Sequence, residues 1–245
     1  EKSSNVGISK VVREKYKNNP EQFVNRLYQL RLNQKLDIEV RGEGEPDIKY
    51  TDNPLWSGLS LPMMSIGYEV RLTPLQILAF YNAIANDGEM VRPMFVEEIR
   101  YHGQVIEEFD KVILNHKLCS DETLDMVRDM LKGVVTNGTA KNLRNSYYKI
   151  AGKTGTCQIA EGKSGYQKRN YQASFAGFFP ADNPQYSCIV VVHKPDARNK
   201  GYYGADVAGP VFKRIAQKIF TDAPSTNEIK NLNKSKNIVI GFGIT

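Results

Sequence analysis

Three segments in the second half of the chain constrain its fold most, because their composition is typical of β-strands. They span Tyr147–Thr156, Gln172–Phe179 and Tyr186–His193, and all are rich in β-branched and aromatic residues. The turn-like segment Pro180–Pro184 lies between the last two, and it is too short for the crossover helix that parallel strands require. We therefore expect those two strands to pair antiparallel.

Helix signals account for much of the remaining chain. Residues 6–34 predict two helices, the second with Asn19 as its N-cap and Pro20 in its first turn. Thr73-Pro74 begins an apolar helix that ends at Asp87-Gly88. Two further helix starts are expected at Ser120 and near Pro210.

The other segments predict a loop, a hairpin and a tail. Between Arg41 and Leu72 glycines and prolines interrupt every hydrophobic period, which predicts a long loop. Residues 91–114 alternate loosely around His102-Gly103 and predict a small hairpin. The end of the chain is polar and rich in Asn and Lys, so we expect residues 221–245 to be a polar C-terminal tail.

Composition excludes several classes of protein. Hydrophobic residues make up 41% of the 245, enough for a sizeable core. No run approaches the roughly 18 apolar residues of a membrane helix, and no signal peptide opens the chain. Because the chain starts at Glu1 without a methionine, we expect it to be a piece of a longer protein. Its cysteines and histidines lie in no ligand or disulfide spacing, and we expect no cofactor and no metal.

The net charge of +6 is concentrated in one stretch. Residues 141–170 hold seven Lys or Arg and one acid, so the rest of the chain is neutral overall. A basic nucleic-acid-binding module is therefore an alternative to consider. No helix carries a row of basic residues beside base-reading side chains, so we expect no nucleic acid among the partners.

The basic stretch contains Lys153-Thr154-Gly155-Thr156 on the first predicted strand. Two Gly-Lys pairs, at 152–153 and 162–163, are no phosphate loops, because both lack the glycine five residues earlier. A strand with Lys-Thr-Gly suits acyl transfer: the ammonium attracts a carboxylate, the glycine permits close approach, and the next N–H can face an oxyanion. An exposed strand end would have the same composition.

A second triplet, Ser3-Ser4-Asn5, lies directly before a predicted helix, where Ser or Asn could simply be a cap. Ser-x-Asn followed about 150 residues later by Lys-Thr-Gly resembles the penicillin-binding proteins, the serine D,D-transpeptidases of peptidoglycan synthesis. Four segments extend the resemblance, most closely to the division-specific class B enzymes: Gly67–Gln76, Ala173–Pro180, Tyr202–Gly204 and Ala208–Phe212.

This resemblance implies an α/β three-layer fold, an antiparallel β-sheet flanked by helices on both faces. In the family the sheet is five-stranded, and its first two strands and the nucleophile helix precede Ser-x-Asn. We therefore expect residues 1–220 to be the C-terminal part of a transpeptidase domain, incomplete at its N-terminal side and holding the last three strands.

The resemblance also implies the site residues, first catalytic and then substrate-binding: Ser3, Asn5 and Lys153, and Thr154, Gly155 and Thr156. Ser3 would relay a proton towards the leaving group, and Asn5 would hydrogen-bond the substrate amide. Lys153 would set the electrostatics around Ser3 and attract the substrate's terminal carboxylate. The hydroxyls of Thr154 and Thr156 would bind that carboxylate, and the Thr156 N–H would form half of the oxyanion hole.

One element of the family pattern, the nucleophile in Ser-x-x-Lys upstream of Ser-x-Asn, is missing here. The formal match Ser146–Lys149 follows Ser-x-Asn and adjoins the Lys-Thr-Gly strand, so we interpret it as a decoy. Two other Ser-x-Asn triplets, Ser225–Asn227 and Ser235–Asn237, follow Lys-Thr-Gly, whereas the family's Ser-x-Asn precedes it, so we reject them as sites. We expect the nucleophile to lie outside this chain, and the fragment alone to be inactive.

The implied activity is that of a peptidoglycan D,D-transpeptidase, which cross-links stem peptides ending in D-Ala-D-Ala and is the target of β-lactams. Implied partners are divisome proteins, including a glycosyltransferase. The implied location is the periplasmic face of the bacterial inner membrane, with the anchor outside this chain. Alternatives are a carboxypeptidase, a β-lactam sensor or hydrolase of the same fold, and a non-catalytic division scaffold.

Overall fold

The computed structural model describes residues 1–160, 170–196 and 201–222. It divides into two compact units, Ser3–Ser120 and Glu1–Lys2 with Asp121–Thr245, called here the N-terminal and the C-terminal unit. No helix among the described residues has the length and apolar character needed to cross a membrane.

The C-terminal unit is built on a three-stranded sheet of order β7-β8-β9, in which both pairs are antiparallel. The strands are β7 (Ala151–Gln158), β8 (Tyr171–Phe179) and β9 (Tyr186–His193). The expected antiparallel pairing is confirmed. The expected start of β7 at Tyr147 is wrong, because β8 ends before Pro180 and the register therefore stops at the Ala151–Phe178 pair.

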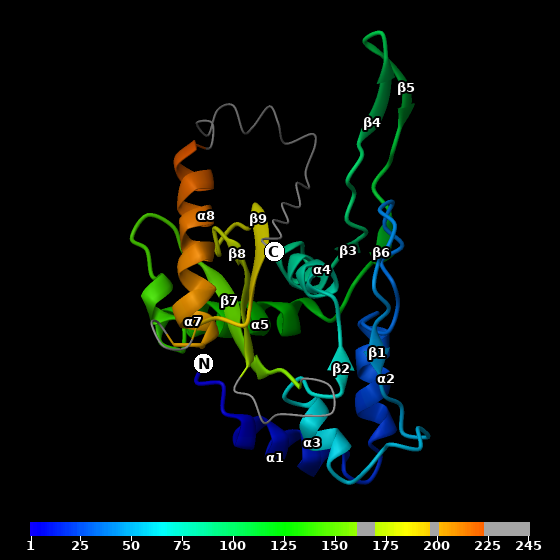
Figure 1. Ribbon diagram of the computed structural model, residues 1–245, viewed down its shortest axis with the longest axis vertical. Coiled ribbons are helices and arrows are strands. Elements are labelled where there is room, and N and C mark those ends of the chain that lie inside the picture. The colour runs from blue at the N-terminus through cyan, green and yellow to red at the C-terminus, as the bar shows by residue number, and fades with distance from the viewer. Residues whose placement is uncertain (161–169, 197–200, 223–245) are drawn as a thin grey trace. The chain divides into compact units, whose positions relative to one another are not determined.

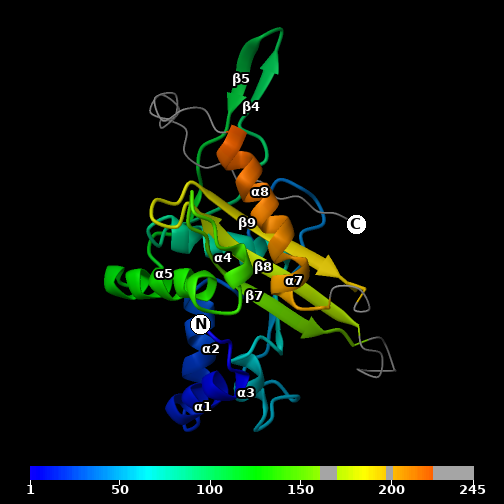
Figure 2. The ribbon, with the colours of Figure 1, turned by 90° about the vertical axis from the view of Figure 1, so that its left-hand side faces the viewer.

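Helix α8 packs on one face of this sheet, and Figure 2 shows it lying across the strands. The helical elements are α5 (Asp121–Thr136), η1 (Lys141–Leu143), α7 (Gly204–Val207) and α8 (Gly209–Asp222). Phe212 of α8 meets Phe175 of β8 edge-to-face, with ring centroids 4.7 Å apart, and both side chains are fully buried. Val134 and Val135 of α5 join the same core, which holds the sheet and both helices together.

The N-terminal unit contains the helices α1 (Asn5–Tyr16), α2 (Glu21–Gln29), α3 (Ser60–Met64) and α4 (Pro74–Ala85). Two helices within 6–34 are confirmed. Asn19 is not the cap of α2: Pro20 holds that position without a side-chain bond, and Asn19 instead accepts the N–H of Gln22 at its backbone oxygen. The expected start of α4 at Thr73-Pro74 is confirmed, and Thr73 caps the helix in a capping box with Gln76.

Three small antiparallel pairs complete the N-terminal unit: β1 (Asp47–Ile48) with β2 (Val70–Arg71), β3 (Met90–Val91) with β6 (Ile113–Asn115), and β4 (Glu98–Tyr101) with β5 (Gln104–Glu108). The expected hairpin is confirmed, and its turn residues His102 and Gly103 have positive φ, as a tight hairpin requires. In Figure 1 this hairpin projects from the β3–β6 pair.

The expectation of a long loop over 41–72 is wrong. The segment holds β1, α3 and β2, elements too short to produce a hydrophobic period. They form because Ile48 and Met64 are buried against Val24 of α2, so tertiary packing supplies the stability that local pattern does not show.

At the C-terminal end, α8 runs to Asp222, two residues into the segment expected to be a tail. The rest of that segment lies outside the described residues, as do Ser225–Asn227, Ser235–Asn237 and the Gly162-Lys163 pair. The boundary at residue 220 stays a prediction.

Candidate active site

The Lys153–Thr156 run lies on β7, which is an outer strand of the described sheet. The N–H of Ile159 donates to the Asn170 oxygen at 2.8 Å, just beyond the β7–β8 ladder. Because donors alternate along an antiparallel strand and the register is regular, the N–H of Thr156, three residues earlier, points away from β8. The open edge of β7 thus presents the N–H expected to serve an oxyanion.

Packing gives a second reason, besides access, for a glycine at position 155. A Cβ at this position would collide with Oγ of Ser174 on the paired strand. The glycine therefore leaves room for the Ser174 side chain at the candidate site, a reason that the sequence alone did not reveal.

Lys153 is partly buried, and its Nζ donates to the backbone oxygen of Thr154 at 2.9 Å. Burial lowers the pKa of Lys153 below its usual value. Its ammonium forms no ion pair within the part of the chain that the structure describes. A partly desolvated cation without a carboxylate partner is suited to attract an anionic ligand.

The two threonine hydroxyls of the run each have a defined partner. Thr154 Oγ1 lies 3.0 Å from Oγ1 of Thr139, in the loop after α5. Thr156 Oγ1 accepts the N–H of Gly204, the first residue of α7, at 3.0 Å. Since residues two apart on a strand share a face, these hydroxyls lie on the same side of β7.

Ser3 and Asn5 flank the residue that caps α1. The cap is Ser4, whose hydroxyl accepts the N–H of Gly7 at 3.1 Å. Ser3 has a left-handed backbone conformation (φ 53°) and is exposed, and Asn5 is the exposed first residue of the helix. The capping explanation therefore accounts for Ser4 but not for Ser3 or Asn5.

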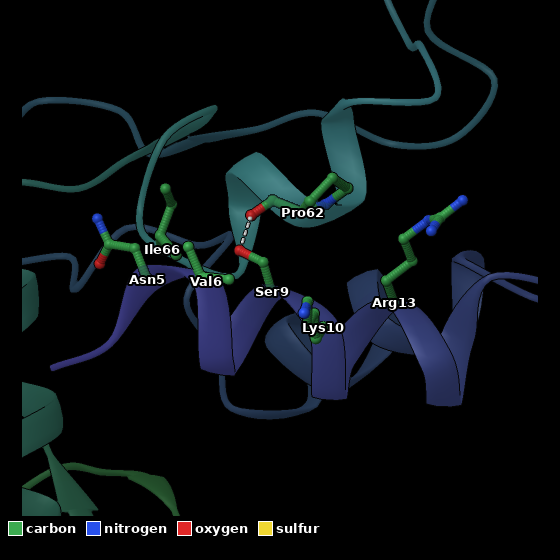
Figure 3. Close-up of a pocket in the computed structure, with 7 residues that line it drawn as sticks. All are labelled: Asn5, Val6, Ser9, Lys10, Arg13, Pro62 and Ile66. Carbon is green, nitrogen blue, oxygen red and sulfur yellow. Dashed lines mark hydrogen bonds between the residues drawn. The ribbon is translucent and has the colours of Figure 1, made fainter.

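A pocket of about 330 Å³ adjoins Asn5 between α1 and α3, as Figure 3 shows. Its lining is Asn5, Val6, Ser9, Lys10, Arg13, Pro62 and Ile66. The Ser9 hydroxyl oxygen lies 3.2 Å from the Pro62 backbone oxygen and 3.2 Å from the Ser65 hydroxyl oxygen, and it is hydrogen-bonded to both. The lining includes no carboxylate, and its one hydroxyl is already hydrogen-bonded, so the pocket offers no acid–base pair.

Ser3 and Asn5 belong to the N-terminal unit, and Lys153–Thr156 belongs to the C-terminal unit. Each group has the local setting described above. Their assembly into one site stays a prediction.

The rejected Ser146–Lys149 match has its own structural setting. The Nζ of Lys149 lies 2.8 Å from Asp182, whose carboxylate also takes Lys132 at 3.3 Å. The Lys149 ammonium is thus engaged by a carboxylate, which supports the interpretation of this match as a decoy.

Sequence reasoning did not place two features beside the Lys-Thr-Gly strand, a cluster of tyrosines and Thr139. Tyr171 stacks on Tyr202 with ring centroids 3.9 Å apart, and Tyr202 contacts Tyr203 at 4.5 Å. The adjacent Gly204 binds Thr156, so this aromatic cluster is next to the run. Thr139 is the second feature. The pair Tyr202-Tyr203 was a visible signal, whereas Thr139 had none beyond the turn that precedes it.

No group of three or more His, Cys, Asp or Glu side chains among the described residues is placed to hold a metal ion.

Comparison with known proteins relates both units to one family. Residues 1–217 match the family described as penicillin binding protein transpeptidase domain. The chain is 33% identical over 224 residues to penicillin-binding protein PbpB of Mycolicibacterium smegmatis, covering 88% of this chain and 33% of that protein. It is 28% identical to stage V sporulation protein D of Bacillus subtilis, covering 86% and 34%. The chain thus spans about a third of the length of these relatives.

Solved structures show the same likeness. Penicillin binding protein 3 of Mycobacterium tuberculosis, complexed with aztreonam, superposes with a TM-score of 0.74 at 30% identity, covering all of this chain and 53% of the other. The transpeptidase domain of Burkholderia pseudomallei penicillin-binding protein 3 gives 0.70 at 28% identity, covering 91% and 63%. The fold is therefore the α/β transpeptidase fold, and the chain belongs to the penicillin-binding protein transpeptidase domain family.

Proposed function

We propose that these residues form part of a peptidoglycan D,D-transpeptidase that β-lactams acylate. The observation that carries the proposal is the array on the edge of β7: a partly buried ammonium, two threonine hydroxyls on one face and an outward N–H. An array of donors without a neutralising acid is built for a carboxylate next to a carbonyl that becomes an oxyanion.

In the proposed reaction, a serine outside these 245 residues attacks the penultimate D-Ala carbonyl of a stem peptide. The serine–carbonyl bond forms while the peptide bond to the terminal D-Ala breaks, and the departing amine takes a proton relayed by Ser3. Asn5 hydrogen-bonds the substrate amide, and the Thr156 N–H stabilises the oxyanion. The amine of a second stem peptide then displaces the serine and forms the cross-link.

The ligand's terminal carboxylate binds the hydroxyls of Thr154 and Thr156, and Lys153 supplies the positive charge. Gly155 leaves the strand edge open beside them. A β-lactam enters the same place because its ring resembles the D-Ala-D-Ala end and carries a carboxylate.

Family membership also supports proposals about the setting. We propose that the protein acts at the periplasmic face of a bacterial inner membrane, through an anchor outside this chain. Its partners there would be divisome proteins, including a glycosyltransferase. The class B segments at Gly67–Gln76 and Ala208–Phe212 support the division-specific type.

The test is the intact mass of the natural protein, in full, after incubation with benzylpenicillin. We expect a gain of one penicilloyl group that persists for hours, and a rate of acylation at least about 100-fold lower in Lys153→Ala. Lys141→Ala, an exposed lysine outside β7, is the matched control and should react as the wild type does.

Three outcomes would overturn the proposal in different ways. Absence of an adduct would favour the non-catalytic scaffold. Rapid turnover of the adduct would favour a β-lactam hydrolase. Acylation of Lys153→Ala at the wild-type rate would agree with family membership but would show that Lys153 has no role in the site.

A further inference from the structure

The loop that follows α5 is held tightly beside β7. The N–H of Ala140 donates to the Val134 oxygen at 3.1 Å, and the N–H of Thr139 donates to the Glu1 oxygen at 3.2 Å. Gly138 has no room for a Cβ, which would come within 2.7 Å of the Val134 Cα. These contacts leave the Thr139 side chain with a defined position, 3.0 Å from the Thr154 hydroxyl.

The direction of that hydroxyl pair decides what Thr154 can do. A threonine hydroxyl has one proton and two lone pairs, and a carboxylate only accepts. If Thr154 donates to Thr139, it has no proton left for a carboxylate. If Thr139 donates to Thr154, the Thr154 proton is free to point at the ligand.

Thr156 shows the second arrangement in a form that cannot reverse. Its partner is the backbone N–H of Gly204, which can only donate. The Thr156 hydroxyl therefore keeps its own proton for a ligand. The two hydroxyls on one face of β7 are equivalent donors to a ligand only if Thr139 donates to Thr154, as the Gly204 N–H donates to Thr156.

We propose that Thr139 is a positioning residue: its hydroxyl donates to Thr154 and so directs the Thr154 proton towards the ligand's terminal carboxylate. This inference rests on the proposed function, because it takes the carboxylate to bind at Thr154. Chains of hydroxyl donors also strengthen one another, which adds to the bond that Thr154 makes to the anion.

The experiment compares Thr139→Val, which keeps the shape but has no hydroxyl, with Thr139→Ser, which restores one. Stopped-flow acylation of the full natural protein separates the dissociation constant of the first complex from the acylation rate constant. For benzylpenicillin, Thr139→Val should raise the dissociation constant about 3- to 10-fold, the effect of one lost hydrogen bond. Its acylation rate constant should change little, and Thr139→Ser should be close to wild type.

The methyl ester of benzylpenicillin, whose carboxylate is blocked, is the control ligand. Thr139→Val should bind it as the wild type does. An equal loss for acid and ester would mean that Thr139 only supports the fold, and no loss for either would mean that Thr154 needs no donor. Both results overturn the proposal.

Failure of the proposed function would appear separately, as a wild-type protein that is not acylated. Thr139 would then be tested by equilibrium binding of N-acetyl-D-Ala-D-Ala, followed through the NMR signal of the Thr154 methyl group. Weaker binding in Thr139→Val than in Thr139→Ser supports the role, and equal binding in both overturns it.

Discussion

At the scale of single residues, the candidate site depends on how Lys153 is held. Its Nζ contacts the neighbouring Thr154 carbonyl rather than an acid, and burial lowers the pKa of Lys153. The folded-state pKa therefore lies below the unfolded value of 10.5. The burial cost of the charged form is fully present at neutral pH and disappears as the pH rises towards 10.5. Burial thus destabilises the charged form of Lys153 at a position where the proposed reaction needs a cation.

This depressed pKa predicts the pH dependence of β-lactam acylation. We expect the alkaline loss of acylation rate in the full protein to occur below pH 10.5, because Lys153 loses its charge early. Lys153→Arg, which stays charged to a pH above about 12, should move this loss upward or abolish it. An alkaline limb that Lys153→Arg leaves unchanged would mean that another group titrates there.

At the scale of elements, the first residue of α7 lies closer to the sheet than any side chain at position 204 would permit. A Cβ on Gly204 would collide with the Ser174 backbone oxygen and lie 2.6 Å from the Gly155 oxygen. Close approach also makes possible the bond from the Gly204 N–H to Thr156. The contact explains why a glycine follows the two tyrosines.

Gly204→Ala should therefore displace α7 from the strand and release the Thr156 hydroxyl. We expect the dissociation constant for benzylpenicillin to rise about 10-fold, the effect of one misplaced donor. Gly58→Ala, at a position with open space around it, is the control and should leave binding unchanged. Unchanged binding in Gly204→Ala would show that the contact with α7 does not position Thr156.

The helix α8 supports the same sheet through aromatic packing. Phe212 contacts Phe175 and Phe179, with ring centroids 4.7 and 5.8 Å away, and is fully buried. Phe212→Ala should lower the free energy of unfolding of the C-terminal unit by about 3–5 kcal/mol, measured by urea denaturation. Met130→Ala, on an exposed position of α5, should change it by less than about 0.5 kcal/mol. A loss of the same small size in Phe212→Ala would exclude this packing as the main support of the sheet.

At the scale of the whole molecule, the family pattern spans both units. Ser-x-Asn belongs to Ser3–Ser120, and Lys-Thr-Gly belongs to the unit with Asp121–Thr245. The proposed chemistry needs both triplets and a serine activated by a nearby lysine. Within these residues the formal Ser-x-x-Lys is the match at Ser146, whose Lys149 is paired with Asp182.

We therefore expect the 245-residue chain by itself not to be acylated by benzylpenicillin. Its intact mass should stay near 27.7 kDa after incubation, while the full natural protein gains a penicilloyl group. A penicilloyl adduct on Ser3 or Ser146, located by peptide mapping, would contradict this expectation and place the nucleophile within the chain.

Features that depend on neighbours in sequence could be predicted from sequence alone. The capping box of α4, the tight turn of the hairpin and the strand character of β7, β8 and β9 all follow from residue types within a few positions. The chemistry of Lys-Thr-Gly could be inferred in the same way, because one strand carries the cation, the hydroxyls and the glycine.

Only the tertiary structure decided which groups complete those residues. Thr139 reaches Thr154 across 15 positions, and Gly204 reaches Thr156 across 48. Such contacts depend on where β7 meets the loop after α5 and on how closely α7 approaches the strand, and no local pattern encodes either. The sequence by itself therefore determined the chemical character of the β7 edge, whereas packing decided which partners orient its donors, because orientation comes from contacts between distant segments.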